Sequence, residues 1–424
     1  MVQARIAILE DSRGKVLAIL PEQQLLHLAL LNHSYQRALR ALAAEQVQKI
    51  FLPSLLSQPH LFDKLFTLPI LLDHSLRDAT SLEVYEPVSG LRFPLDASAL
   101  QNAQIFRFAV DPQQLDHTST PLEDDEQAIL LAVDRFTSLR IKERLADTLE
   151  IPPLPMTAQR IIQLGSNKNA DVDDLVPLVE DDPSLAAQVI SWASSPYYAA
   201  PGQIQSVKDA IVRVLGFDLV MNLALGLSLN RSLRVPKDNK LEVKAYWKQA
   251  VCCAMVMELL VKAMPAAKRP GKGMAYLAGL LHNFGYLVLA HVFPPHFSLI
   301  NRYLECNRNL ASQHVEKQVL GVTREQVGSW LLQCWQLPPE VWKGIRYMGH
   351  HRYDGEADIF AHLLTVTLGL LAERGIGHCP GPGLDESLIA SLGLDLVVCR
   401  QQVDELLNNS DHLNTLLAAL EQTA

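Results

Sequence analysis

The sequence lacks the residue patterns that mark several common functions. Its six cysteines show no C-x-x-C spacing, so reduced thiols fit better than a disulfide framework or a zinc knuckle. No G-x-S-x-G, Walker A or G-x-G-x-x-G pattern is present, which leaves acyl transfer and nucleotide hydrolysis without support. The hydropathy pattern predicts no transmembrane helix, and Glu10 and Asp11 come too early for a signal peptide. We therefore expect a cytoplasmic protein that does not bind membranes.

Positive charge is also in the minority. The 424 residues include 37 lysines and arginines against 46 aspartates and glutamates, which gives a net charge of −9. This balance disfavours a broad nucleic-acid-binding surface, although a local basic patch is compatible with it. Hydrophobic residues make up 49% and charged residues 20%, as in ordinary globular proteins, and the length is sufficient for two or three domains.

The first 118 residues are predicted to form a small α+β domain. The apolar runs "ARIAILED" and "KVLAIL" flank a turn and predict a β-hairpin. "EQVQKIFLP", "LPILLD" and "SLEVYEP" predict further strands, and "SYQRALRALAAEQ" predicts a helix. Residues 119–149 are predicted to be a linker and a connecting helix, since acidic residues 123–126 stand where they favour a helix N-terminus.

From residue 150 onward the apolar periodicity predicts almost only helices. Asp171 and Ser206 are predicted N-caps, and Gly216 is predicted to end a helix. We assign residues 150–374 to one helical domain and residues 384–424 to a C-terminal helical extension. The predicted fold class is therefore multidomain, with an N-terminal α+β part followed by an all-α part.

An ordered series of motifs lies in the helical part. It runs through "IPPLP", "EDDPSLAAQVISWASSPYY", "IQSVKDAIVRVLG", "YWKQA", "YLAGLLHNFG" and "GVTREQVGSWLLQCWQLPPEVWKGIRYMGHH". The series resembles the HDOD family, bacterial regulatory domains related to the HD metal-dependent phosphohydrolases, over about residues 150–372. The order and spacing of the motifs make the resemblance specific.

The resemblance to HD enzymes implies ligand positions that this sequence can be compared with. Gln249 stands where the first ligand histidine is expected, and His282-Asn283 replaces the His-Asp doublet. Arg324 occupies a position where relatives often carry histidine. Thr365 and Val366 stand in place of the final aspartate.

Both ligand carboxylates are therefore lost, and no metal or other cofactor is expected. If an ion binds at all, the remaining candidate ligands are His282, His350 and His351. We predict instead that His282 and Asn283 belong to a buried polar remnant in which His350 or His351 supplies hydrogen-bond partners. A helix terminus with two solvated histidines is the alternative for His350 and His351.

The N-terminal part more weakly resembles the aminoacyl-tRNA deacylase (tRNA-edit) family. "QARIAILEDSRGKVLAIL" is similar to that family's early hairpin, and "LPILLDHSL" is similar to its stretch around an aspartate, here Asp73. The resemblance implies a lysine in the first strand, where this chain has Gln3, and the nearest cation is Arg5. The family's glycine-proline loop has no match at the expected place. Deacylase activity is therefore not expected.

Two segments are candidate interaction surfaces. One is a basic loop, and the other places aromatic residues next to serines at a helix end. Their alternatives are a solvated loop and aromatic residues packed under the next helix. The residues are Lys268, Arg269 and Lys272 in the first segment, and Trp192, Ser194, Ser195, Tyr197 and Tyr198 in the second. The Cys252-Cys253 pair is predicted to be core.

These observations predict a non-catalytic bacterial regulatory protein of signal transduction that binds protein partners through its HDOD domain. The alternatives are an HD-type metal-dependent phosphohydrolase, a nucleotide-sensing domain without turnover, and an aminoacyl-tRNA deacylase in the N-terminal domain.

Overall fold

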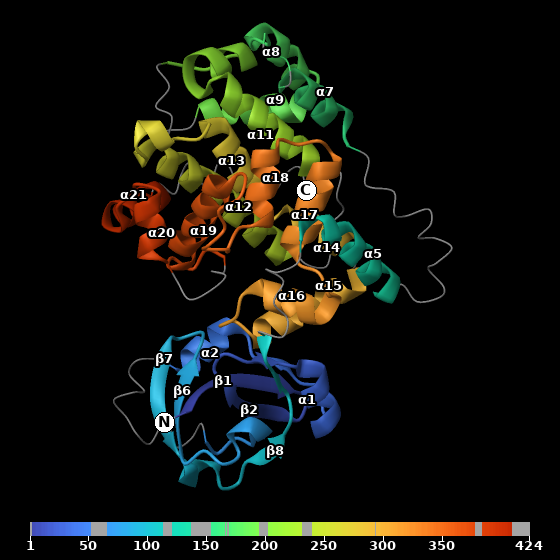
Figure 1. The fold of residues 1–424 in the computed structure, drawn as a ribbon, viewed down its shortest axis with the longest axis vertical. Helices are drawn as coiled ribbons and strands as arrows, with labels where there is room; N and C mark the ends of the chain where they lie inside the picture. The colour runs from blue at the N-terminus through green and yellow to red at the C-terminus, as the bar shows by residue number, and fades with distance from the viewer. Residues whose placement is uncertain are drawn as a thin grey trace. The chain divides into compact units, whose positions relative to one another are not determined.

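The chain forms two compact units (Figure 1). The structure, a computed structural model, describes residues 2–51, 66–112, 121–136, 154–194 apart from 166 and 168, 202–230, 240–377 apart from 293, and 384–408. Unit 1 comprises Met1–Ser119 together with Pro295–Gly321, and unit 2 comprises Thr120–Pro294 and Val322–Ala424. The sequence assigned 295–321 to the helical domain, whereas the structure packs this segment with the N-terminal residues.

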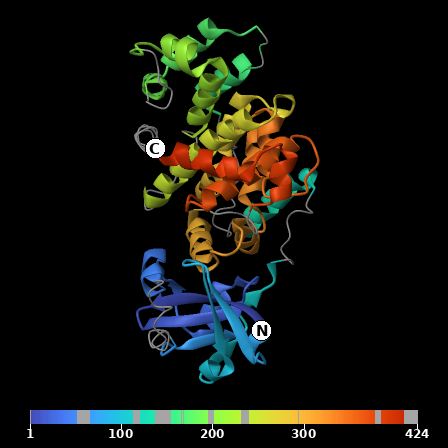
Figure 2. The same ribbon diagram turned by 90° about the vertical axis from the view of Figure 1, so that its left-hand side faces the viewer.

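The described residues of unit 1 form a mixed seven-stranded sheet of order β7-β6-β1-β2-β5-β8, with β4 paired to β1. Strands β1 and β2 form the expected antiparallel hairpin, whereas β1–β6 and β2–β5 are parallel pairs. Figure 2 shows these strands in blue from a second side. The strands are β1 Val2–Asp11, β2 Gly14–Pro21, β4 Arg40–Ala41, β5 Ile70–Asp73, β6 Ser81–Glu86, β7 Leu91–Asp96 and β8 Gln104–Phe106, with a separate pair β3 Leu25–Leu26 and β9 Ala109–Val110.

Two predictions in unit 1 are wrong. The segment "EQVQKIFLP" begins in a helix, α2 (Ala44–Ile50), because Val47 and Phe51 recur at helical spacing and both enter the core. The helix expected over "SYQRALRALAAEQ" is instead split. Helix α1 (Leu28–Tyr35) ends at Gln36, which adopts a left-handed conformation, and the chain then extends into β4.

The two faces of strand β1 have different partners. Ala4, Ile6 and Ile8 enter a hydrophobic core shared with α2 and the neighbouring strands. Arg5, one position out of phase, belongs to the opposite face by strand alternation, and it hydrogen-bonds to the end of α15 (Pro294–Cys306). Helices α15 and α16 (Ser312–Leu320) therefore complete unit 1.

In its described residues unit 2 contains only helices, coloured from teal at α5 through green to red in Figure 1. They are α5 Asp125–Phe136, α7 Met156–Gly165, α8 Val172–Glu180, α9 Pro183–Ala193, α10 Val207–Ala210, α11 Phe217–Asn230, α12 Lys240–Ala263, α13 Lys272–Leu281, α14 Phe284–Val292, α17 Arg324–Cys334, α18 Pro339–Arg346, α19 Asp358–Ala372, α20 Glu386–Ser391 and α21 Leu396–Asn408. Asp171 and Ser206 cap α8 and α10 as predicted. Gly216, with a φ of 84°, ends the π-helical turn that follows α10, also as predicted.

The hydropathy pattern predicted no segment able to cross a membrane. One uncharged stretch in unit 2 is nevertheless long and apolar enough to do so. It spans Gly273–His291 and is 89% buried inside the protein. A stretch so fully covered by other helices is what the core of a helical domain shows, since a spanning helix would present its apolar surface to lipid. Cys252 and Cys253 are fully buried on α12, in agreement with the prediction that they are core.

Candidate functional site

The site is built where two helix pairs cross at glycines. A Cβ at Gly279 on α13 would lie 2.6 Å from Cα of Ala254 on α12, so only glycine permits this approach. A Cβ at Gly285 on α14 would lie 1.8 Å from the carbonyl oxygen of Arg324, and the facing residue on α17 is Gly328. The two glycines of "YLAGLLHNFG" thus hold His282 and Asn283 against α12 and the first turn of α17.

His282 is a buried neutral imidazole. Its side chain is 2% exposed, and its Nδ1 lies 2.7 Å from the carbonyl oxygen of Gly279. Burial, helped by the positive charge of Arg324 and opposed by the hydrogen bond to Gly279, lowers the pKa of His282 to about 4. Among the described residues its Nε2 has no hydrogen-bond partner.

The state of His282 predicts a loss of stability in mild acid. Because its pKa falls from about 6.5 in the unfolded chain to about 4 in the folded chain, the unfolded chain takes up the proton first as the pH decreases. The stabilisation is complete above pH 6.5 and is lost as the pH falls toward 4. Between pH 7.5 and pH 5 the free energy of unfolding should decrease by about 2 kcal/mol through this group alone.

The measurement is urea unfolding of the wild type and of His282→Gln at both pH values. The wild type should lose about 2 kcal/mol more than the variant over this interval. His33→Gln, which removes an exposed histidine, serves as the control and should behave like the wild type. An unchanged pH dependence in His282→Gln would mean that His282 does not titrate as a buried base.

Asn283 binds a cation from the protein itself. The side chain of Arg324 donates a hydrogen bond from Nη1 to Oδ1 of Asn283 at 3.0 Å. The guanidinium carbon of Arg324 also lies 4.9 Å from the ring centre of Tyr286, within cation–π distance. Thr323 and Gln326 form a capping box that fixes the helix start at Arg324. A guanidinium therefore contacts the doublet position that holds a metal ion in HD enzymes.

The segment "YWKQA" on α12, where the first ligand histidine of HD enzymes is expected, makes packing contacts instead. Tyr246 stacks on Tyr286, with ring centres 6.2 Å apart, and burial raises the pKa of Tyr246. The Gln249 side chain lies against Gly377, where a Cβ would come within 2.4 Å of Nε2. The sequence pattern did not single out the aromatic pair, since a tyrosine in an apolar helix is equally typical of core.

The histidines at 350 and 351 follow the end of α18. His350 packs edge-on against Tyr347, and Nδ1 of His351 lies 3.6 Å from an Asp385 oxygen. The Thr365 hydroxyl accepts a hydrogen bond from the Gly349 N–H at 2.8 Å and donates one to the Ala361 carbonyl. A hydroxyl at the place of the final aspartate thus joins α19 to the turn that carries the histidines.

The donor groups present do not fit a metal ion. Within the described part of the chain, no three His, Cys, Asp or Glu side chains converge closely enough to hold one. The hydrogen-bond partners of the doublet are the Gly279 carbonyl and Arg324, rather than the expected His350 or His351. An amide oxygen that already accepts from a guanidinium, beside a permanent positive charge, is a poor ligand for a divalent cation.

The positions compared with the deacylase family also have structural contacts. Gln3 is exposed and donates to Glu83 across the sheet. Arg5 is 1% exposed and donates to three residues, and burial lowers its pKa to about 10. Asp73, also buried, accepts hydrogen bonds from the N–H groups of Ser75, Phe108 and Ala109.

The two candidate surfaces differ from their description in the sequence. Trp192 is 2% exposed and therefore belongs to the core, because α9 turns it inward. Ser194 is exposed at the end of that helix, while Ser195, Tyr197 and Tyr198 lie outside the described residues. Lys268 donates to the Ser391 carbonyl at the end of α20, and Arg269 donates to the Met264 carbonyl within its own loop. Lys272 begins α13.

Unit 2 also contains a buried ion pair that the sequence did not predict. Asp125 begins α5, and its carboxylate binds the guanidinium of Arg346 and the amide of Gln326, the latter at 2.6 Å. Asp125 and Arg346 are 2% and 1% exposed. Asp125 was interpreted only as one of four acids at a helix N-terminus, and no local pattern distinguishes it from its neighbours.

Comparison with known proteins identifies the helical region. The sequence model of the HDOD domain family matches residues 151–352 of this chain. A protein of known structure from Marinobacter aquaeolei VT8, provisionally described as a signal transduction protein, is 39% identical over 99% of this chain and 93% of its own, with a TM-score of 0.86. The chain belongs to the HDOD-domain proteins.

Two further comparisons are more distant. A protein from Shewanella amazonensis SB2B, provisionally described as a phosphohydrolase, is 19% identical over 69% of this chain and 98% of its own, with a TM-score of 0.52, which shows a shared fold alone. An uncharacterized protein from Treponema pallidum (strain Nichols) is 24% identical over 286 residues, or 63% of this chain. This HDOD-domain protein covers only about half of that relative's length (54%).

Proposed function

We propose that this HDOD-domain protein is a non-catalytic regulator of bacterial signal transduction that acts in the cytoplasm by binding protein partners through its helical domain. The relative from Marinobacter aquaeolei VT8 supports the assignment to signalling, because the similarity extends over nearly the whole chain. Control would come from the assembly or conformation of helical surfaces.

The contact between Arg324 and Asn283 carries the non-catalytic part of the proposal. HD-type hydrolysis uses a bound ion to activate water and to stabilise charge on the phosphate. Here the doublet has lost its carboxylate, and a guanidinium that stays protonated at every physiological pH contacts the remaining amide. His282 keeps one nitrogen on the Gly279 carbonyl. The amide oxygen of the doublet is therefore already bonded to a guanidinium, while the buried Nε2 of His282 has no hydrogen-bond partner among the described residues.

Within the same proposal, unit 1 is a tRNA-edit-like domain that no longer deacylates aminoacyl-tRNA. The support is that Arg5 and Asp73 are buried and hydrogen-bonded to main-chain atoms, so neither is available to position an ester. Incubation of the full chain with charged tRNA should release no amino acid above the uncatalysed rate.

The test of the non-catalytic site is metal content and turnover. Untagged protein, expressed with added Mn, Fe, Ni and Zn, should contain less than about a tenth of an ion per chain by elemental mass spectrometry. It should also leave phosphodiester substrates uncleaved in the presence of each metal.

His282→Ala and the exposed control His33→Ala define the contradicting outcome. The proposal would be contradicted if the wild type and His33→Ala each held about one ion per chain and cleaved phosphodiesters, and if His282→Ala lost both the ion and the activity. The protein would then be a hydrolase. Stabilisation of the wild type by a cyclic dinucleotide without any product would instead indicate a ligand-sensing domain.

A further inference from the structure

A cleft of about 650 Å³ lies in unit 1 where the β1–β2 turn faces the end of α1. Its walls carry Arg13, Arg37 and Arg40 but one carboxylate, Asp11. This local excess of positive charge contrasts with the net charge of −9 of the whole chain. The volume is within the range of about 300–1,000 Å³ that is usual for small-molecule sites.

The floor of the cleft is a fixed ion pair. Arg37 binds both oxygens of Asp11, with Nε 2.8 Å from Oδ2, and also donates to the Gly14 carbonyl. The hydrogen bond from Arg37 lowers the pKa of Asp11 to about 2. The guanidinium also lies 5.4 Å from the ring centre of Tyr35. The hydrogen bonds hold the two side chains in place. Because their charges largely neutralise each other, other groups determine which ligand charge the cleft binds.

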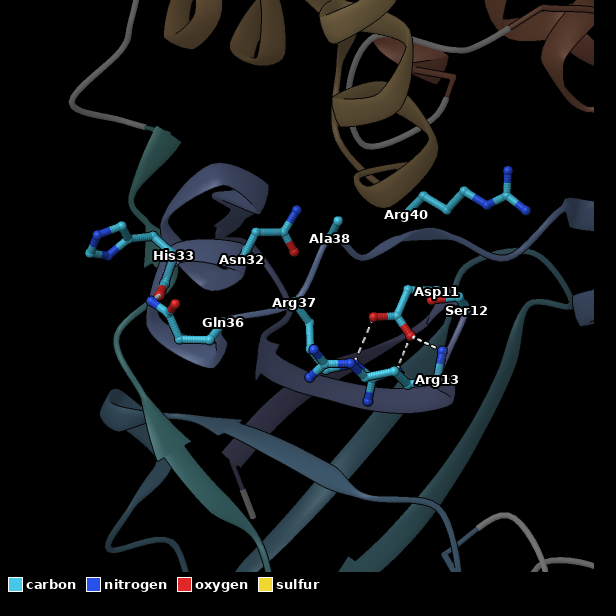
Figure 3. Close-up of a pocket in the computed structure, with 9 residues that line it drawn as sticks. All are labelled: Asp11, Ser12, Arg13, Asn32, His33, Gln36, Arg37, Ala38 and Arg40. Carbon is cyan, nitrogen blue, oxygen red and sulfur yellow. Dashed lines mark hydrogen bonds and ion pairs between the residues drawn. The ribbon is translucent and has the colours of Figure 1, made fainter.

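The amides of the facing wall are already engaged. Asn32 accepts from the N–H of Leu39 and donates to its carbonyl, and Gln36 donates to the His33 carbonyl. Figure 3 shows that the His33 ring points away from the Asp11–Arg37 pair. The facing wall therefore contributes shape rather than further hydrogen-bond donors.

Two arginines and one hydroxyl remain. The guanidinium of Arg13 makes no ion pair with any residue that the structure describes, and the adjacent Ser12 is exposed. Arg40 extends outward at the rim with its side chain 71% exposed, and its contact with Glu10 is 3.3 Å long. Guanidinium forks match the oxygens of phosphate, and charge-assisted bonds of this kind are the strong ones.

We propose that this cleft binds a small phosphate-bearing ligand, with Arg13 and Arg40 as the phosphate-binding residues and the Arg37–Asp11 pair as its floor. The site lies in unit 1 and is independent of the non-catalytic role proposed for the HDOD domain. Its opening at the surface suits a ligand that exchanges with solvent rather than a resident cofactor.

The experiment is isothermal titration calorimetry of the full chain with ATP and with pyrophosphate. Adenosine, which is ATP without its phosphates, serves as the uncharged control. ATP should bind and adenosine should not, and the affinity for ATP should fall with added salt because the contacts are exposed ion pairs. If pyrophosphate binds as tightly as ATP, the ligand is an inorganic or sugar-linked phosphate. If ATP binds at least about tenfold more tightly, the cleft also recognises the base, since about 1.4 kcal/mol corresponds to a factor of ten.

The double substitution Arg13→Ala with Arg40→Ala should weaken ATP binding by about tenfold or more, because it removes two exposed charge-assisted contacts. Arg77→Ala removes another exposed arginine of unit 1 outside the cleft and should leave binding unchanged. Both side chains of the double variant are exposed, so its circular dichroism spectrum and unfolding should match the wild type.

Three outcomes would overturn the proposal. Binding retained within about twofold by the double variant would place the ligand elsewhere, and sulfate binding as tightly as ATP would indicate an adventitious ion only. Loss of tRNA binding in the double variant without any ATP binding by the wild type would make the cleft part of an RNA-binding surface.

Discussion

Replacing Arg346 by methionine is expected to lower the free energy of unfolding of unit 2 by about 3–5 kcal/mol. The substitution leaves the Asp125 carboxylate, 2% exposed, without the guanidinium that now neutralises it. A single buried charge without its partner is among the most costly defects a folded protein can carry. Methionine fills a similar volume, so the loss reports the charge rather than a cavity.

Tryptophan fluorescence during urea unfolding is the appropriate measurement. All five tryptophans, at positions 192, 247, 330, 335 and 342, belong to unit 2, so their signal follows that unit alone. The matched control is Arg160→Met. It breaks the exposed pair with Asp181, 2.6 Å long, and should cost less than about 1 kcal/mol.

The combined variant Arg346→Met with Asp125→Leu removes both charges. It should recover much of the loss, because replacing a buried pair by apolar groups is often neutral. Equal losses in Arg346→Met and Arg160→Met would show that the buried pair contributes no more than a surface contact.

The sequence predicted what depends on local pattern. The caps at Asp171 and Ser206 follow from residue type and spacing, and the β1–β2 hairpin follows from two apolar runs around a turn. The region after α1 was mispredicted because its apolar residues fit a strand and a helix almost equally well. The distinction is made by Gln36, whose left-handed conformation ends α1 and is not visible in the sequence.

The site was predictable in composition but not in its contacts. The loss of the doublet carboxylate can be seen in Asn283, and the positive charge that repels a metal can be seen in Arg324. That these two side chains bind each other depends on the close crossing of α14 and α17 at Gly285, which no spacing rule gives. The same applies to the assignment of α15 and α16 to unit 1, which rests on contacts between residues about 280 positions apart.

Asn307 holds these distant segments together. Its Oδ1 accepts hydrogen bonds from Arg5 at 2.6 Å and from the Leu26 N–H at 2.7 Å, and its Nδ2 donates to the carbonyls of Leu26 and Tyr303. The side chain is fully buried. A single amide therefore satisfies a buried cation and both main-chain groups of a β-strand residue.

Asn307→Leu is expected to destabilise unit 1 by about 3 kcal/mol or more, since each of the three groups at Arg5 and Leu26 that loses its partner costs about 1–3 kcal/mol. Leucine keeps the branched shape of asparagine but has bulkier methyl groups, so crowding of this fully buried position adds to the loss of the polar contacts. Hydrogen exchange measured on peptides from β1, followed by mass spectrometry, should show a protection factor lower by about 100-fold.

Asn309→Ala is the matched control. Asn309 lies two residues further along the same loop, and among the described residues its side chain donates one hydrogen bond, 2.7 Å long, to the Glu22 carbonyl. Its replacement should therefore cost about 1 kcal/mol. If Asn307→Leu lowered β1 protection no more than Asn309→Ala, α15 and α16 would not be an integral part of unit 1. If protection in β1 fell while the tryptophan transition of unit 2 kept its midpoint, then the segment 295–321 is energetically part of the N-terminal unit, although the HDOD match runs through it.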